Sequence, residues 1–184
     1  LYKATNNVEH KEVAITTYNN IIARQNNPKG KWSKAYKGTR DLKNFSLPMI
    51  LCNLSLLLEE VLGKENVDKM VPPLIEDIMT NFLNKEHGIL MENIYPDGQL
   101  CDSFEGRQIN PGHGNESMWF LMDLAVRYHN PDLIKKCEEI LIHTTEFGWD
   151  KEFGGIYYFL DIKGHPMQEL QWNQKLWWVH IETM

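Results

Sequence analysis

A spacing of 66 residues that recurs in the C-terminal part of the chain is the feature that most constrains its fold. Seven residues repeat at this offset without a gap, and the pairs are Lys85/Lys151, Glu86/Glu152, Gly88/Gly154, Gly98/Gly164, Gln108/Gln174, Glu116/Glu182 and Met118/Met184. The matches fall where helices end, where hairpins turn and where the next helices begin. This pattern predicts a duplicated structural unit. A ring of such units would bring Glu116 and Glu182 toward one axis.

Hydrophobic residues at intervals of three and four positions predict a mainly helical chain. The expected helices cover residues 8–23, 46–62, 66–83, 110–128 and 131–147, with a last helix beginning near residue 173. Two hairpins are expected as well, at residues 89–94 with a return strand after a turn at 95–98, and at residues 155–160 with 166–171. Residues 31–44 are polar and are expected to form a loop. The order of these elements indicates a single all-α domain over residues 1–184.

Composition restricts the classes of function that such a chain can have. The 184 residues suffice for one core but not for two ordinary domains. A formal net charge of -6, with Lys and Arg scattered, argues against nucleic acid as a partner. No apolar stretch of the sequence is long enough to cross a bilayer, so no membrane partner is expected. Three widely spaced cysteines give no zinc or disulfide pattern, which favours a reducing, cytoplasmic location.

The first candidate site lies where a turn leads into an apolar helix. Asn110 is suited to cap this helix and Pro111 to take its first position. His113 and Glu116 then share one face. The positive helix end should keep His113 neutral, as a general base must be, while Glu116 orients the ring or binds a substrate hydroxyl. The alternative is a capping histidine beside a solvated carboxylate; a metal site is not favoured, because further ligands at suitable spacing are missing.

The second candidate site lies in residues 175–182. Trp178 and Glu182 are four residues apart on one helical stripe, and His180 points away from it. An aromatic ring beside a carboxylate is a common way to hold a sugar, because CH groups stack on the ring and hydroxyls bond to the acid. The alternative is that Trp177 and Trp178 are simply core residues. The repeat favours a functional interpretation, since Glu182 corresponds to Glu116.

These motifs together resemble the N-acylglucosamine 2-epimerase family, in the family's order and over most of the chain. The matching segments are residues 106–113 with Glu116, Trp119 and Phe120, residues 149–150 with Gly154 and Gly155, residues 175–182, and residues 46–50. The resemblance implies an (α/α)6 barrel, here partial, with short β-hairpins between helix pairs. It also implies a sugar pocket at one end of the barrel.

The resemblance implies a sugar 2-epimerase that interconverts N-acetylglucosamine and N-acetylmannosamine, or acts on a related aldose or cellobiose. In this family two histidines deprotonate and reprotonate C2 of the ring-opened sugar through an enediolate, without a metal or another cofactor. The implied site residues are His113 and Glu116 for catalysis and Trp119, Trp178, His180 and Glu182 for substrate binding. The implied partner is a small sugar. Whether the protein binds a nucleotide effector and whether it forms a homodimer are left open.

Two parts of the family pattern have no counterpart in this sequence. The second catalytic histidine is not matched, and neither Arg24 nor Arg40 lies in the family's N-terminal arginine motif. We therefore expect the chain to be a fragment that is inactive alone, and we assign the activity to the full-length protein. Two other classes stay open: a non-catalytic carbohydrate-binding helical toroid, and a glycoside hydrolase of similar barrel fold that uses Glu116 and Glu182 as its acid/base pair.

Overall fold

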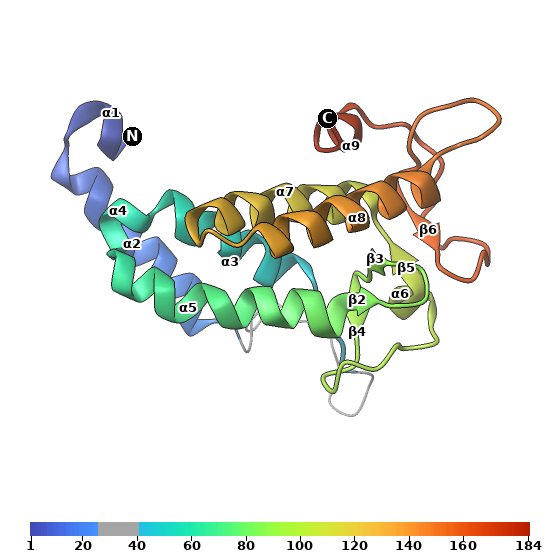
Figure 1. Cartoon of the computed structure of the whole chain (residues 1–184), viewed down its shortest axis with the longest axis horizontal. Helices are drawn as coiled ribbons and strands as arrows, with labels where there is room; N and C mark the ends of the chain where they lie inside the picture. The colour runs from blue at the N-terminus through green and yellow to red at the C-terminus, as the bar shows by residue number, and fades with distance from the viewer. Residues whose placement is uncertain (26–40) are drawn as a thin grey trace.

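The computed structural model describes residues 1–25 and 41–184, which are mainly helical, as predicted (Figure 1). The helices are α1 Tyr2–Thr5, α2 Val8–Ala23, α3 Ser46–Leu57, α4 Glu59–Leu62, α5 Lys64–Asp77, the π-helical turn η2 Ile78–Phe82, α6 Phe104–Arg107, α7 Pro111–Arg127, α8 Pro131–Gly148 and α9 Trp177–Ile181. The strands, each of two residues, are β1 Lys43–Asn44, β2 Leu83–Asn84, β3 Ile89–Leu90, β4 Asn93–Ile94, β5 Gln108–Ile109 and β6 Leu160–Asp161. The predicted loop at 31–44 lies largely outside the described residues, and β1 replaces its last two positions.

Apolar periodicity located most of the helices correctly. α2 has the predicted bounds, and α7 and α8 agree with prediction to within one residue at each end. The prediction for residues 46–62 is corrected, because the chain breaks at Leu58 into α3 and α4. Pro72 and Pro73 lie inside α5. The last helix, α9, begins later than predicted, at Trp177.

The core forms where the long helices meet. α7 packs along α8 and against α3, and α3 packs against α5. Figure 1 shows α7 and α8 side by side, with α5 beneath them. α7 contributes Met118, Leu121 and Leu124, all 0% exposed, and the rings of Phe45 and Phe82 meet at 5.4 Å between centroids. Burial of this apolar surface holds the helices together, so polar side chains on α7 require a separate explanation.

The predicted hairpins have the wrong strand partners. β4 pairs with β1, β3 pairs with β2, and β6 pairs with β5, all antiparallel. Within the described part of the chain, no return strand forms between residues 95 and 107 or between 166 and 171. Two-residue strands are too short for alternating hydrophobicity to indicate the partner, and two of the ladders join segments far apart in the chain.

The 66-residue repeat is confirmed by backbone pairing. The register Lys43↔Ile94 of the β1–β4 ladder recurs at the same offset as Ile109↔Leu160 of the β5–β6 ladder. The first residues of α7 and α9 are also 66 positions apart. The start of α9 is therefore the structural equivalent of the start of α7, one unit later.

The strands and α6 gather at the end of the helix layer where α7 begins (Figure 1). α9 packs against α7. Short ladders at this end therefore position the first turns of α7 and α9 relative to each other. Within residues 1–25 and 41–184, no helix is long and apolar enough to cross a membrane.

Candidate active site

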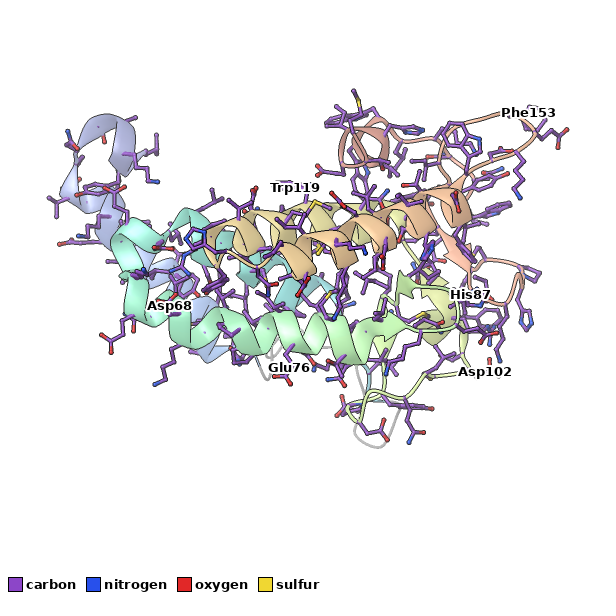
Figure 2. The ribbon with its side chains drawn as sticks, viewed as in Figure 1. Asp68, Glu76, His87, Asp102, Trp119 and Phe153 are labelled. Atoms are coloured by element: carbon purple, nitrogen blue, oxygen red, sulfur yellow. The ribbon has the colours of Figure 1, made fainter. Side chains whose placement is uncertain are left out.

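The first turns of α7 carry an accessible stripe between buried residues of the same helix. Asn110 caps the helix as predicted, since its Oδ1 accepts a hydrogen bond from the His113 N–H at 3.2 Å. His113 and Glu116 are half-buried and Trp119 is 37% exposed. Because residues three apart share a helix face, these side chains point to one side. In Figure 2, Trp119 lies on the side of α7 that is turned away from α5.

The carboxylate that contacts His113 belongs to Glu92, a residue that sequence reasoning missed. His113 Nδ1 lies 3.0 Å from Oε1 and 3.2 Å from Oε2 of Glu92. The Glu92 side chain is 10% exposed and that of His113 is 30% exposed. The prediction that Glu116 orients the ring is therefore corrected, because Glu116 acts on His113 only through its charge. The available signal was a lone acid directly after the apolar run 89–91.

The pKa of His113 is raised rather than lowered. Burial alone lowers the pKa, but the hydrogen bond to Glu92 and the negative charges of Glu92 and Glu116 outweigh burial. The expectation that the positive helix end keeps this histidine neutral is thus wrong, because two nearby carboxylates dominate the local field. An imidazole with a raised pKa is a stronger base.

The two acids that are one repeat apart come together, as predicted. Burial raises the pKa of Glu116, and the negative charge of Glu182 raises it further, against the opposing effect of His113. Glu182 is held in place by Trp119, whose Nε1 donates a hydrogen bond to Oε2 at 2.8 Å. His113, Glu116, Trp119 and Glu182 therefore form one cluster across α7 and the end of α9.

Trp178 provides an aromatic wall beside His113. The two ring centroids are 5.6 Å apart and the ring planes are inclined by 37°. Tyr158 meets Trp178 at right angles, with the centroids 6.0 Å apart. Trp178 is half-buried, and its neighbour Trp177 is 74% exposed, so neither indole is an ordinary core residue. We name the set His113, Glu92, Glu116, Glu182, Trp119 and Trp178 the His113 cluster.

His180 does not belong to the His113 cluster. Its Nδ1 lies 2.7 Å from the carbonyl oxygen of Leu176, and its Nε2 accepts a hydrogen bond from the Ile156 N–H at 3.0 Å. A carbonyl only accepts and an N–H only donates, so this ring is neutral and carries its hydrogen on Nδ1. Both nitrogens are used, and the prediction that His180 binds substrate is corrected: it fastens α9 to the segment around Ile156.

The loop that precedes α7 is fixed by Arg107. Its side chain is 9% exposed, and its Nε donates to Asp161 Oδ2 at 2.8 Å while Nη1 donates to Asp102 Oδ1 at 2.7 Å. Lys163 Nζ donates to the other Asp102 oxygen at 2.9 Å. These ion pairs flank the β5–β6 ladder. They hold the entry of α7, and with it His113, against the following unit.

The His113 cluster shows no metal-binding arrangement. No group of three or more His, Cys, Asp or Glu side chains that could hold a metal ion occurs in the part of the chain that the structure describes. A hollow of about 430 Å³ lies at the C-terminal end of α8 and is lined by Thr145, Glu146, Trp149 and Lys151. None of these residues was a predicted site residue. The expectation of chemistry without a metal or another cofactor stays a prediction.

Solved structures with a similar fold include two cellobiose 2-epimerases. The enzyme from Bacillus thermoamylovorans matches with a TM-score of 0.75 and 17% identity, covering 98% of this chain and 48% of that chain. The enzyme from Spirochaeta thermophila matches with a TM-score of 0.73 and 16% identity, covering 98% and 47%. At this level of identity the likeness shows the fold. The chain is thus part of an (α/α)6 barrel, the class of fold found in sugar epimerases.

Sequence comparison narrows this class to one family. Residues 3–184 match the profile of N-acylglucosamine 2-epimerase (GlcNAc 2-epimerase). The chain is 31% identical to N-acylglucosamine 2-epimerase of Rattus norvegicus and 32% identical to that of Mus musculus, in both cases over 100% of this chain and 45% of the relative. The chain belongs to the N-acylglucosamine 2-epimerase family. It spans somewhat less than half the length of these curated relatives.

Proposed function

We propose that the full-length protein is a sugar 2-epimerase that interconverts N-acetylglucosamine and N-acetylmannosamine, or a related aldose. The observation that carries this proposal is the His113 cluster, in which a half-buried imidazole is paired through Nδ1 with Glu92 and faces Trp178. The rat and mouse relatives are named N-acylglucosamine 2-epimerases, which supports the choice of substrate class.

The proposed reaction begins with the open-chain sugar, whose C1 aldehyde makes the C2 hydrogen acidic. His113 Nε2 takes the C2 proton, the C–H electron pair forms a C1=C2 double bond, and O1 takes the negative charge. A second acid, which we expect elsewhere in the full-length protein, returns a proton to C2 from the opposite face as the electrons move back from O1. An imidazole suits this task because its pKa lies close to neutrality.

The remaining cluster residues would bind the sugar. Trp178 offers a flat apolar face to the CH groups of the substrate. Glu182 is already oriented by Trp119, so it can accept hydrogen bonds from sugar hydroxyls without rearranging. Glu116, whose pKa is raised by burial and by Glu182, is the carboxyl in this group best able to hold a proton and donate it to a substrate oxygen.

The test is solvent exchange at C2. Full-length protein is incubated with N-acetylmannosamine in deuterated water, and both N-acetylglucosamine and deuterium at C2 are measured. His113→Asn keeps a side-chain N–H toward Glu92 but removes Nε2, and should lower the rate of conversion to N-acetylglucosamine by about 10²–10⁴-fold. His165→Ala, which removes an exposed histidine from the loop after β6, is the matched control and should react like wild type. Equal rates of conversion for His113→Asn and wild type would refute the proposal.

One observation favours a second candidate, a glycoside hydrolase. Two carboxyl groups lie near each other, and the raised pKa of Glu116 is the property required of a general acid. This candidate predicts release of reducing sugar from a glycoside by full-length protein, with loss of that activity in Glu116→Gln and in Glu182→Gln. It also predicts that His113→Asn retains hydrolysis, which separates it from the epimerase.

A further inference from the structure

We propose that Glu92 is a positioning residue that holds the His113 imidazole in the tautomer with hydrogen on Nδ1, so that the Nε2 lone pair faces the substrate. The inference deepens the proposed function. It rests on that function only where it assigns Nε2 the task of deprotonating a sugar. The tautomer itself is a property of the free protein. It can be measured without any substrate.

The contact geometry fixes which nitrogen carries the hydrogen. Nδ1 lies within hydrogen-bond distance of both Glu92 oxygens, at 3.0 Å and 3.2 Å. An ionised carboxylate can only accept hydrogen bonds, so Nδ1 must donate. In the neutral ring, Nε2 is then the unprotonated nitrogen. Within residues 1–25 and 41–184, every hydrogen bond of the His113 ring is made through Nδ1.

The Glu92 backbone is held on both sides, so its carboxylate has a defined place. Its carbonyl oxygen accepts hydrogen bonds from the Phe45 N–H at 2.9 Å and from Asn44 Nδ2 at 3.3 Å. Its N–H donates to the Gln108 carbonyl at 3.3 Å. Glu92 thus links the start of α3 to the strand that precedes α7. A rigid acceptor of this kind fixes the orientation of a histidine ring as well as its tautomer.

The fold itself does not require an acid at this position. The residue one repeat after Glu92 is Tyr158, and its ring packs on Trp178 in the first turn of α9, the helix equivalent to α7. The scaffold thus directs this position toward the next helix start and accepts an aromatic side chain there. Burying a carboxylate is unfavourable unless a partner compensates for it. Its hydrogen bond to His113 therefore explains the presence of Glu92 better than packing does.

The groups that face His113 determine how its pKa should change when Glu92 is replaced. Glu92 comes from the β3–β4 connection, Glu116 from α7 itself, and Trp178 from α9, while Glu182 acts on Glu116. Among these, Glu92 alone makes a hydrogen bond to the ring. Removing its negative charge should therefore lower the pKa of His113, because burial continues to act and the main compensating interaction is lost.

The first arm of the test measures the tautomer in full-length protein without substrate. Two-bond ¹H–¹⁵N correlation spectra should show protonated Nδ1 and unprotonated Nε2 for His113 above its pKa. In Glu92→Gln, the Nδ1–H tautomer should no longer be exclusive and the pKa should fall. Glu76→Gln, on the exposed surface of α5 (Figure 2), is the matched control and should leave both unchanged. Identical spectra for Glu92→Gln and Glu76→Gln would overturn the inference.

The second arm measures C2 exchange as a function of pH. Glu92→Gln should lower kcat by about 10²-fold or more with KM little changed, because the ring is misoriented while the sugar contacts remain. The acidic limb of kcat/KM, where the His113 base becomes protonated, should move to lower pH. Glu92→Asp keeps the negative charge but has a shorter side chain, so its carboxylate lies farther from the ring. It should recover the Nδ1–H tautomer and part of kcat. Should Glu92→Gln fail to fold, Glu92→Asp carries the test. Retention of the Nδ1–H tautomer with a lowered kcat supports the inference, and loss of that tautomer with wild-type kcat overturns it.

The two arms separate the inference from the proposed function. If wild-type protein exchanges no deuterium but the tautomer depends on Glu92, the epimerase assignment fails and the positioning role stands. If wild type exchanges and Glu92→Gln matches it in kcat, pH profile and tautomer, the positioning role fails and the epimerase assignment stands.

Discussion

Gly112 determines how closely the indole of Trp178 can approach α7 beside His113. A Cβ on Gly112 would lie 2.6 Å from both Cη2 and Cζ3 of Trp178, and 3.0 Å from a methyl carbon of Val179. Contacts of this kind between a backbone-fixed Cβ and a rigid ring cannot be relieved without moving the ring. Helix propensity favours alanine over glycine by only about 1 kcal/mol, whereas overpacking typically costs about 1–3 kcal/mol. The cost of the steric clash should therefore exceed the gain in helix propensity.

We predict that Gly112→Ala destabilises the protein by about 1 kcal/mol and raises KM for the sugar, because the Trp178 ring is displaced. Chemical denaturation and steady-state kinetics measure the two effects. A double-mutant cycle provides the control. In a Trp178→Ala background the clash is gone, so the same substitution should be neutral or stabilising. An equal loss in both backgrounds would show that Trp178 is not the obstacle.

Single residues also show how far sequence reasoning reaches. Asn110, Pro111 and His113 were placed correctly because capping and proline preferences are local. Glu92 was missed because it lies far from His113 in sequence and belongs to no spacing motif. His180 was misassigned because motif membership does not reveal that both of its nitrogens are used by backbone groups.

At the scale of elements, the repeat extends to individual turns. Gly98 donates its N–H to the Tyr95 carbonyl at 2.9 Å, and Gly164 donates to the Asp161 carbonyl at the same distance. Both glycines have positive φ, 83° and 71°. The spacing of glycines therefore predicted these turns correctly. Their flanking strands were mispaired, because the true partners lie in the segments before α3 and α7.

We predict that Gly164→Ala destabilises the protein by about 1–2 kcal/mol, since an added Cβ meets no atom within 4 Å and only the left-handed backbone is unfavourable. Gly164→Asn should cost less, because asparagine tolerates this conformation. Urea denaturation of wild type and the two variants measures the order of their free energies of unfolding. Equal loss for alanine and asparagine would point to a steric cause instead.

The ion pair between Arg107 and Asp161 supports the entry of α7 and should respond to pH. Burial raises the pKa of Asp161, but hydrogen bonds from Arg107 and from backbone N–H groups outweigh burial and leave it lowered. A lowered folded-state pKa contributes stability that is present above the unfolded pKa and lost as pH falls through the folded pKa. Arg107→Met removes the main partner of this carboxylate.

We predict that Arg107→Met lowers the melting temperature most near pH 7, and that the difference from wild type narrows as pH falls below about 4. Lys163→Met is the control, because among residues 1–25 and 41–184 Lys163 forms its ion pair with the exposed Asp102, so its loss should change the melting temperature little. A difference from wild type that is the same at pH 7 and at pH 3 would contradict the assigned role of Asp161.

At the scale of the whole molecule, inversion at C2 requires acid/base groups on both faces of a planar intermediate. In the proposed reaction, the described residues would provide His113 on one face, with Glu92 and Glu116 beside it and Trp178 as an aromatic wall. The chain spans 45% of the length of its rat and mouse relatives, and the second histidine and the arginine of the family pattern stay predictions for the full-length protein. The repeated order of helices and turns predicted a ring of helical units, while the (α/α)6 barrel was predicted from the resemblance to the family. The order of helices carries no information about groups that this sequence does not contain.

Exchange at C2 measured separately for the two epimers tests most directly whether His113 is the base on one face. Full-length His113→Asn is incubated in deuterated water with N-acetylglucosamine and, separately, with N-acetylmannosamine, and deuterium at C2 is followed before equilibrium. We predict that one epimer still exchanges, through the base on the other face, while exchange of the other epimer and interconversion fall by about 10²–10⁴-fold. Exchange of both epimers at wild-type rates would contradict the assignment of His113.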